Sequence, residues 1–114
     1  MTASAGGYRF TPEAVVDLRA IFRHTTREFG RQQATRYRDY IMAACLAVAA
    51  SPDPIGSTSP DNISPRLAMY PVRLVTGRTK GASHVLIYTM EDDEDGIIIV
   101  RILHERMDPT TVLS

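Results

Sequence analysis

The chain has 114 residues, of which 44% are hydrophobic and 23% are charged, and its formal net charge is zero. This length and composition predict a single globular domain over residues 1–114. A neutral chain lacks the broad positive field that holds nucleic acid, which argues against broad electrostatic binding to nucleic acid and leaves a local basic patch as the alternative. No direct sequence-specific nucleic-acid binding is predicted. The single cysteine, Cys45, supports neither a disulfide framework nor a cysteine-rich metal site.

The N-terminal stretch MTASAGGYRF lacks the basic region and the apolar run of a signal peptide. The longest run of small apolar residues, 41–50, is too short to span a bilayer. With one unpaired thiol, these features predict a cytoplasmic protein that has no membrane partner. Residues 1–7 are expected to be a flexible N-terminus.

Two helices are predicted in the first half of the chain. Residues 8–11 alternate aromatic and polar side chains, which is typical of a short strand. Thr11 and Pro12 form a good helix start, and apolar residues recur at helical spacing as far as Gly30, a favoured C-terminal cap. A second apolar stripe continues to residue 50. So short a connection predicts an antiparallel helical hairpin.

The second half predicts a sheet. Residues 51–65 contain four prolines and no periodicity, and are expected to be a loop. Residues 66–75 predict a strand or a bent pair of short strands, where Pro71 favours an edge or a kink. Residues 84–90 and 97–104 predict two strands joined by an acidic loop. The order β-α-α-β-β-β indicates an α+β fold with a helical hairpin on one face of a small antiparallel sheet.

The last predicted strand is apolar on both faces. Strict alternation groups its residues into two sets, Ile97, Ile99, Arg101 and Leu103 on one face and Ile98, Val100, Ile102 and His104 on the other. Two helices cover one face of such a sheet. The other face is either open to water, where it marks a partner site, or covered by a loop or by the C-terminal tail, residues 105–114.

Several stretches of this sequence together resemble one family. They are YRFTPEAVVDLRAI, Gly30, QQATRYRDYI, ASPDPIG, HVLIY and, most specifically, IVRILHERMD. In this order they resemble a ParE-type toxin of the RelE/ParE superfamily, the toxic half of a type II toxin–antitoxin pair, over residues 8–113. The segment between Ile55 and His84 departs from the family pattern because it is longer and richer in proline. Nothing is therefore inferred from the family inside it.

The resemblance implies a helical hairpin on a curved antiparallel sheet and a ParD-like antitoxin whose C-terminal segment fills an apolar groove of the toxin. It implies DNA gyrase as the target, inhibited by binding, and no cofactor. RelE-type relatives cleave ribosome-bound mRNA instead, and a shared fold does not choose between the two. The leading hypothesis is a non-enzymatic inhibitor. An mRNA interferase and a non-toxic interaction module are the alternatives.

The end of the last strand carries the candidate catalytic residues of the interferase alternative. There Arg101 and Arg106 would stabilise developing phosphoryl charge, and His104 would act as acid or base. Alternation places Arg101 and His104 on opposite faces unless a bulge intervenes. This favours an ion pair or a partner contact for Arg101 and a structural role for His104.

Basic residues also recur every four positions on the first helix and predict one stripe, either solvated or in contact with gyrase or an acidic antitoxin tail. The full candidate set for antitoxin or target binding is Arg19, Arg23, Arg27, His84, Arg101, His104, Arg106, Met107 and Asp108. The three histidines lack carboxylates at ligand spacing, so no metal site is predicted. Cys45 lies on an apolar stripe and is expected in the core.

Overall fold

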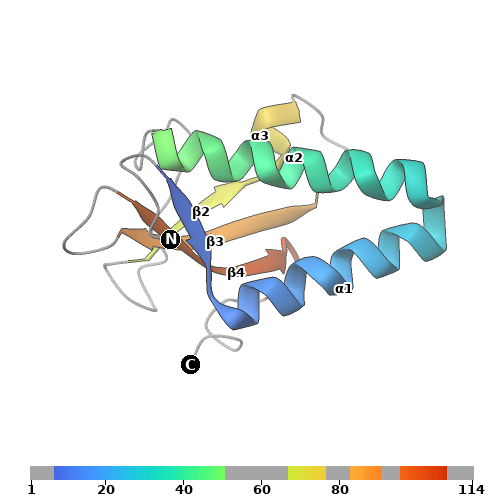
Figure 1. Cartoon of the computed structure of the whole chain (residues 1–114), viewed down its shortest axis with the longest axis horizontal. Helices are drawn as coiled ribbons and strands as arrows, with labels where there is room; N and C mark the ends of the chain where they lie inside the picture. Colours follow the sequence, from blue (N-terminus) through green and yellow to red (C-terminus); the bar gives the residue numbers. More distant parts are fainter. Residues whose placement is uncertain (1–6, 51–66, 77–82, 91–95, 108–114) are drawn as a thin grey trace.

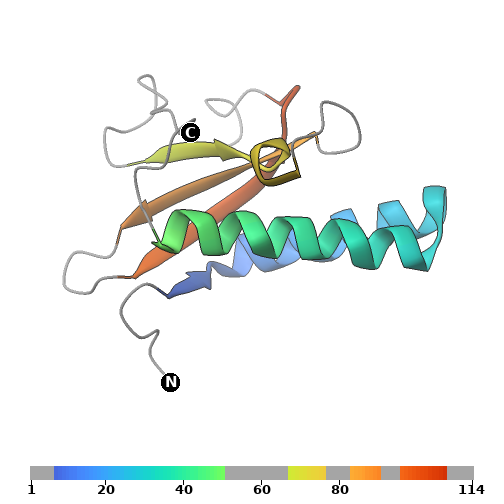
Figure 2. The ribbon, with the colours of Figure 1, turned by 90° about the horizontal axis from the view of Figure 1, so that it is seen from above.

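The structure, a computed structural model, describes residues 7–50, 67–76, 83–90 and 96–107. Its elements in chain order are β1 (Tyr8–Phe10), α1 (Pro12–Phe29), α2 (Arg31–Ala50), β2 (Ala68–Pro71), α3 (Arg73–Thr76), β3 (His84–Met90) and β4 (Ile97–His104). The strands form one four-stranded sheet, and the hairpin of α1 and α2 lies along one of its faces (Figures 1 and 2). The predicted α+β class and the helical hairpin are therefore confirmed.

The sheet is mixed, which corrects the expectation of an antiparallel sheet. Its order is β1-β4-β3-β2, and β1 runs parallel to β4 while the other two pairs are antiparallel. Pairing between the first and last strands of a chain is a non-local contact that residue alternation within either strand does not reveal. It places the start of α1 directly beside the middle of β4.

The ends of α1 follow from local chemistry. The Thr11 hydroxyl accepts a hydrogen bond from the Ala14 N–H at 3.1 Å, and Pro12 occupies the first helical position. Gly30 has a φ of 91°, a conformation that costs other residues strain, and its N–H donates to the Thr26 carbonyl. Because α2 begins at the next residue, Gly30 alone makes the hairpin turn.

The main core lies between the hairpin and the sheet. On the helices its buried residues are Ala14, Tyr37, Ile41, Ala44, Cys45, Val48 and Ala49, and beyond them they are Tyr70, Val72, Leu86, Tyr88, Ile97, Ile99 and Ile102. Cys45 is fully buried, as the apolar stripe predicts. Burial raises the pKa of its thiol to about 12, so the thiol stays protonated at neutral pH.

The opposite face of the sheet carries a second, smaller cluster. Val85, Ile87 and Leu103 are buried there, at 6%, 0% and 2% exposure. Leu67, Met69 and Val100 pack against them. The sequence pattern did not decide whether this apolar face is exposed to water or covered. In the structure the residues at its centre are buried.

A β-bulge in β4 overturns the predicted division of its residues. Tyr88 pairs with Ile99 and Ile87 pairs with Arg101, so Val100 has no partner on β3. This extra residue shifts the alternation, and the helix-facing residues become Ile97, Ile99 and Ile102 instead of every second position. Ile99 and Leu103, predicted on one face, consequently lie in different clusters.

The segment predicted as a strand over 66–75 is shorter than expected. Pro71 ends β2, which is an edge strand of the sheet, and the chain then turns into the short helix α3. The expected flexible N-terminus, the proline-rich loop, the acidic loop and Asp108 fall almost wholly outside the described residues. No described helix has the length and apolar character to cross a membrane.

Candidate functional site

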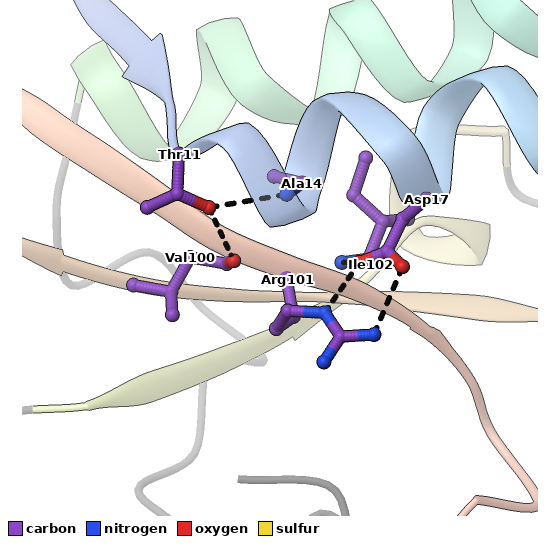
Figure 3. A network of polar contacts seen from close by, with 6 residues as sticks. All are labelled: Thr11, Ala14, Asp17, Val100, Arg101 and Ile102. Carbon is purple, nitrogen blue, oxygen red and sulfur yellow. Dashed lines mark hydrogen bonds and ion pairs between the residues drawn. The ribbon is translucent and has the colours of Figure 1, made fainter.

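Arg101 is held by a carboxylate of α1. Its Nε donates to Asp17 Oδ2 at 2.7 Å and its second terminal nitrogen donates to Asp17 Oδ1 at 3.0 Å (Figure 3). The backbone N–H of Ile102 donates to the same Oδ2 at 3.0 Å. The side chains are only 23% and 13% exposed. Hydrogen bonding to Asp17 raises the pKa of Arg101, so the guanidinium stays charged.

Beyond the end of β1, Thr11 and Asp17 form the hydrogen bonds to β4 that a longer strand would form. The Thr11 N–H donates to the Ile99 carbonyl at 3.0 Å, and its hydroxyl donates to the carbonyl of the bulged Val100 at 2.7 Å. Asp17 then accepts from Ile102, as Figure 3 shows. The first turns of α1 therefore satisfy polar groups of β4 that a strand would otherwise pair. The ion pair expected for Arg101 is present, and it is part of this junction.

An arginine-rimmed groove lies on the helical hairpin. It is an open hollow of about 700 Å³ lined by Leu18, Arg19, Phe22, Arg23, Thr26, Arg27 and Arg38. Leu18 and Phe22 give it an apolar lining, and the guanidinium groups surround them. We call this surface the arginine groove. The basic stripe of α1 is thus combined with apolar surface and with one further arginine from α2.

A histidine cavity of about 500 Å³ lies near the turn end of the hairpin, beside the start of β3 and the end of β4. It is lined by His24, Thr25, Phe29, Gln33, Tyr37, Ser83, His84 and His104. The Tyr37 hydroxyl is 2.6 Å from His84 Nδ1, and the rings of His84 and His104 meet edge to face at 5.4 Å between centroids. All three histidines of the chain therefore share one cavity.

Two rings of this cavity, the half-buried His84 and the buried Tyr37, have shifted pKa values. The pKa of His84 is lowered to about 4, first by burial and then by the neighbouring His104 and His24, while Asp17 opposes part of this shift. Burial raises the pKa of Tyr37 to about 12, and hydrogen bonds to the backbone of His84 and Ser83 partly oppose this. Both side chains are accordingly neutral at pH 7.

The structure distributes the predicted site residues over three places. Arg19, Arg23 and Arg27 line the groove, His84 and His104 line the cavity, and Arg101 pairs with Asp17. Arg106 and Met107 follow in the turn after β4, where the Arg106 N–H donates to His104 Nδ1 at 3.1 Å. Arg101 is bound to Asp17 and is not among the described residues that line the cavity of His104.

Sequence inspection missed several participants. Arg38, Leu18 and Phe22 belong to the groove, and Asp17 and Tyr37 fix Arg101 and His84. Tyr37 carries a usable signal, because a tyrosine on an apolar helical stripe needs a partner for its hydroxyl. Within the described ranges, no three His, Cys, Asp or Glu residues are placed to hold a metal ion.

Comparison with known proteins identifies the family of this chain. The family model described as the ParE toxin of the type II toxin–antitoxin system parDE matches residues 8–109. The toxin ParE of Escherichia coli is 32% identical over 107 residues, covering 94% of this chain and 92% of that protein. A solved structure of the chromosomal ParDE toxin–antitoxin system from P. aeruginosa shares the fold, with a TM-score of 0.65 at 17% identity over 86% of this chain and 94% of that one. This chain therefore belongs to the ParE toxin family of type II toxin–antitoxin systems.

Proposed function

We propose that this ParE-family toxin acts by binding DNA gyrase, without catalysis, and that a ParD-like antitoxin neutralises it by occupying the arginine groove. The observation that carries the proposal is the groove itself. It combines apolar Leu18 and Phe22 with four arginines in one open hollow. Although the chain has no net charge, these arginines produce a local positive field at the groove.

The chemistry of the groove specifies its occupant. Apolar side chains at its base favour a segment that presents an apolar face, and burial of that face supplies affinity. Arginines around them favour acidic side chains at the borders of the same segment, which speed association and select the partner. An acidic amphipathic segment of an antitoxin has both properties. Since Arg19, Arg23 and Arg27 are exposed, they need no rearrangement to meet it.

Two features support inhibition by binding over RNA cleavage. Arg101 is committed to Asp17 through two hydrogen bonds, and releasing it would leave a largely buried carboxylate with one donor. His104 lines the histidine cavity, and Arg101 is not among the described residues of that lining. Catalysis of phosphoryl transfer requires cations and an acid or base group arranged around one phosphate. The commitment of Arg101 to Asp17 therefore supports inhibition by binding over the interferase alternative.

The test of the target uses one preparation of toxin in two assays. We expect loss of gyrase supercoiling or trapping of cleaved DNA, with ribosome-bound mRNA left intact. Removal of residues 108–114 is expected to weaken gyrase inhibition more than it lowers stability, since a terminal segment contributes little to a core. Codon-dependent mRNA cuts with unaffected gyrase would reject the proposal and make His104 and Arg106 the first catalytic candidates.

The test of the groove is antitoxin binding by charge-reversed toxin. Arg23→Glu is expected to weaken the complex and reduce its dependence on salt concentration. Arg36→Glu makes the same change of charge on an exposed residue of α2 that does not line the groove. Equal affinity of the two variants would show that the antitoxin does not use this surface.

A further inference from the structure

The histidine cavity has no part in the proposed binding of an antitoxin at the arginine groove. It lies between elements that are distant in the sequence, with residues from α1, α2, β3 and β4. In Figure 1 the hairpin continues past the ends of the strands at this side of the molecule. The cavity of about 500 Å³ is large enough for a small organic ligand, and its described lining residues include no acidic side chain.

Hydrogen bonding defines which nitrogen of each imidazole carries a proton. The Tyr37 hydroxyl, whose pKa is raised to about 12, keeps its proton at neutral pH and lies 2.6 Å from His84 Nδ1, and we assign the hydroxyl as the donor of this bond and Nδ1 as the acceptor. Likewise the Arg106 N–H donates to His104 Nδ1. A nitrogen that accepts a hydrogen bond carries no proton, which leaves the proton of each ring on Nε2.

The two Nε2–H groups are available donors. Neither Nε2 has a hydrogen-bond partner among the residues that the structure describes, and no described side-chain nitrogen or oxygen is both fully buried and unpaired. The His84 and His104 rings are adjacent, at 5.4 Å between centroids. The Gln33 amide and the Ser83 hydroxyl add further donors to the same lining. This donor-rich lining suits an anion with several acceptor oxygens, although Asp17 and Glu105 lie close enough to act on His84 and Tyr37.

We propose that the histidine cavity binds the phosphate group of a small phosphomonoester through His84 and His104. A tetrahedral phosphate offers acceptors in several directions, which matches donors that come from different elements, whereas a planar carboxylate offers two oxygens. The cavity exceeds the size of the phosphate. Phe29, which is 71% exposed at its rim, provides an apolar ring for the organic part of the ligand.

A pair of His104 variants separates the two ring nitrogens. Asn places an oxygen near the position of Nδ1, so His104→Asn retains an acceptor for the Arg106 N–H and removes the Nε2–H donor. Gln places its amide near the position of Nε2, so His104→Gln retains a donor toward the cavity. Thermal unfolding of both variants establishes that each is folded before its binding is compared.

The experiment follows the ring nitrogen signals of histidine in the full-length ¹⁵N-labelled toxin by NMR during titration with inorganic phosphate, AMP and acetate. We expect saturable changes at His84 and His104 with phosphate and AMP. In His104→Asn, affinity is expected to fall about tenfold or more, and in His104→Gln it should stay closer to that of the parent protein. Tighter binding of AMP than of phosphate would identify a nucleotide-type ligand, and equal binding would identify free phosphate.

Three results would overturn the inference. They are the absence of saturable changes with both phosphate and AMP, equal binding by His104→Asn and the parent protein, and binding of acetate as tight as that of phosphate. The last result would indicate a site for carboxylates, such as acidic side chains of a protein partner. None of these results depends on gyrase or on the antitoxin, so failure here and failure of the proposed function are distinguishable.

Discussion

Replacing Arg101 with methionine removes both hydrogen bonds from the guanidinium to Asp17 while keeping an apolar stem of similar length. Hydrogen bonds to charged groups contribute about 1.5–3 kcal/mol each. Asp17 retains the Ile102 N–H, and its side chain is 13% exposed, so water compensates part of the loss. We therefore expect Arg101→Met to lower the free energy of unfolding by about 2–3 kcal/mol. For a domain of this size the melting temperature should fall by about 8–20 °C.

Urea and thermal unfolding followed by circular dichroism measure this change, and Arg38→Met is the matched control. Arg38 pairs with Asp39 at 3.4 Å, but the side chains are 47% and 65% exposed, so its loss should cost less than about 0.5 kcal/mol. A double-mutant cycle of Arg101→Met with Asp17→Ala should give a coupling of about 1–3 kcal/mol. Equal melting temperatures for the two methionine variants, or zero coupling, would refute a structural role for the junction.

Three further outcomes are expected. The folded-state pKa of His84 is about 4, against about 6.5 in the unfolded chain, so the unfolded state binds the extra proton and stability falls as pH decreases from 6.5 to 4, by up to about 3 kcal/mol. His84→Asn should flatten that part of the pH–stability curve, and an unchanged slope would contradict the assignment. Arg23→Glu should weaken antitoxin binding at low salt more than Arg36→Glu does, as titration calorimetry would measure; identical affinities would exclude the groove. Because Cys45 is fully buried, with a thiol pKa of about 12, it should react with a thiol reagent only after unfolding, and fast labelling of the native protein would contradict this burial.

Local features of the sequence were sufficient to predict the helices α1 and α2. Thr11, Pro12 and Gly30 mark the ends of α1 through bonds and dihedral preferences that involve residues no more than four positions away. The apolar spacing of α2 identifies its buried side because a helix has a fixed period. The basic stripe over Arg19, Arg23 and Arg27 follows from the same period, so part of the arginine groove was predictable.

In the last strand, β4, the local sequence pattern did not predict the structure correctly. Aliphatic residues occupy both faces of the strand, so alternation does not locate the bulge at Val100, and it gave the wrong faces beyond that residue. The bulge depends on α1, since Thr11 and Asp17 bond to Val100 and Ile102 across more than eighty positions of the chain. A carboxylate partner for Arg101 was expected from chemistry, but its identity was not.

The sequence by itself thus determined the two long helices, the strands β3 and β4, the α+β class and the residue types available for binding, because these depend on bonds and periodicities within a few residues. Only the tertiary structure decided that β1 is parallel to β4, that Arg101 belongs to Asp17, and that Arg38 completes a groove with α1. It also decided that His24, His84 and His104 share one cavity. These contacts join residues far apart in the chain, so their geometry arises from the packing of complete elements, which no local pattern encodes.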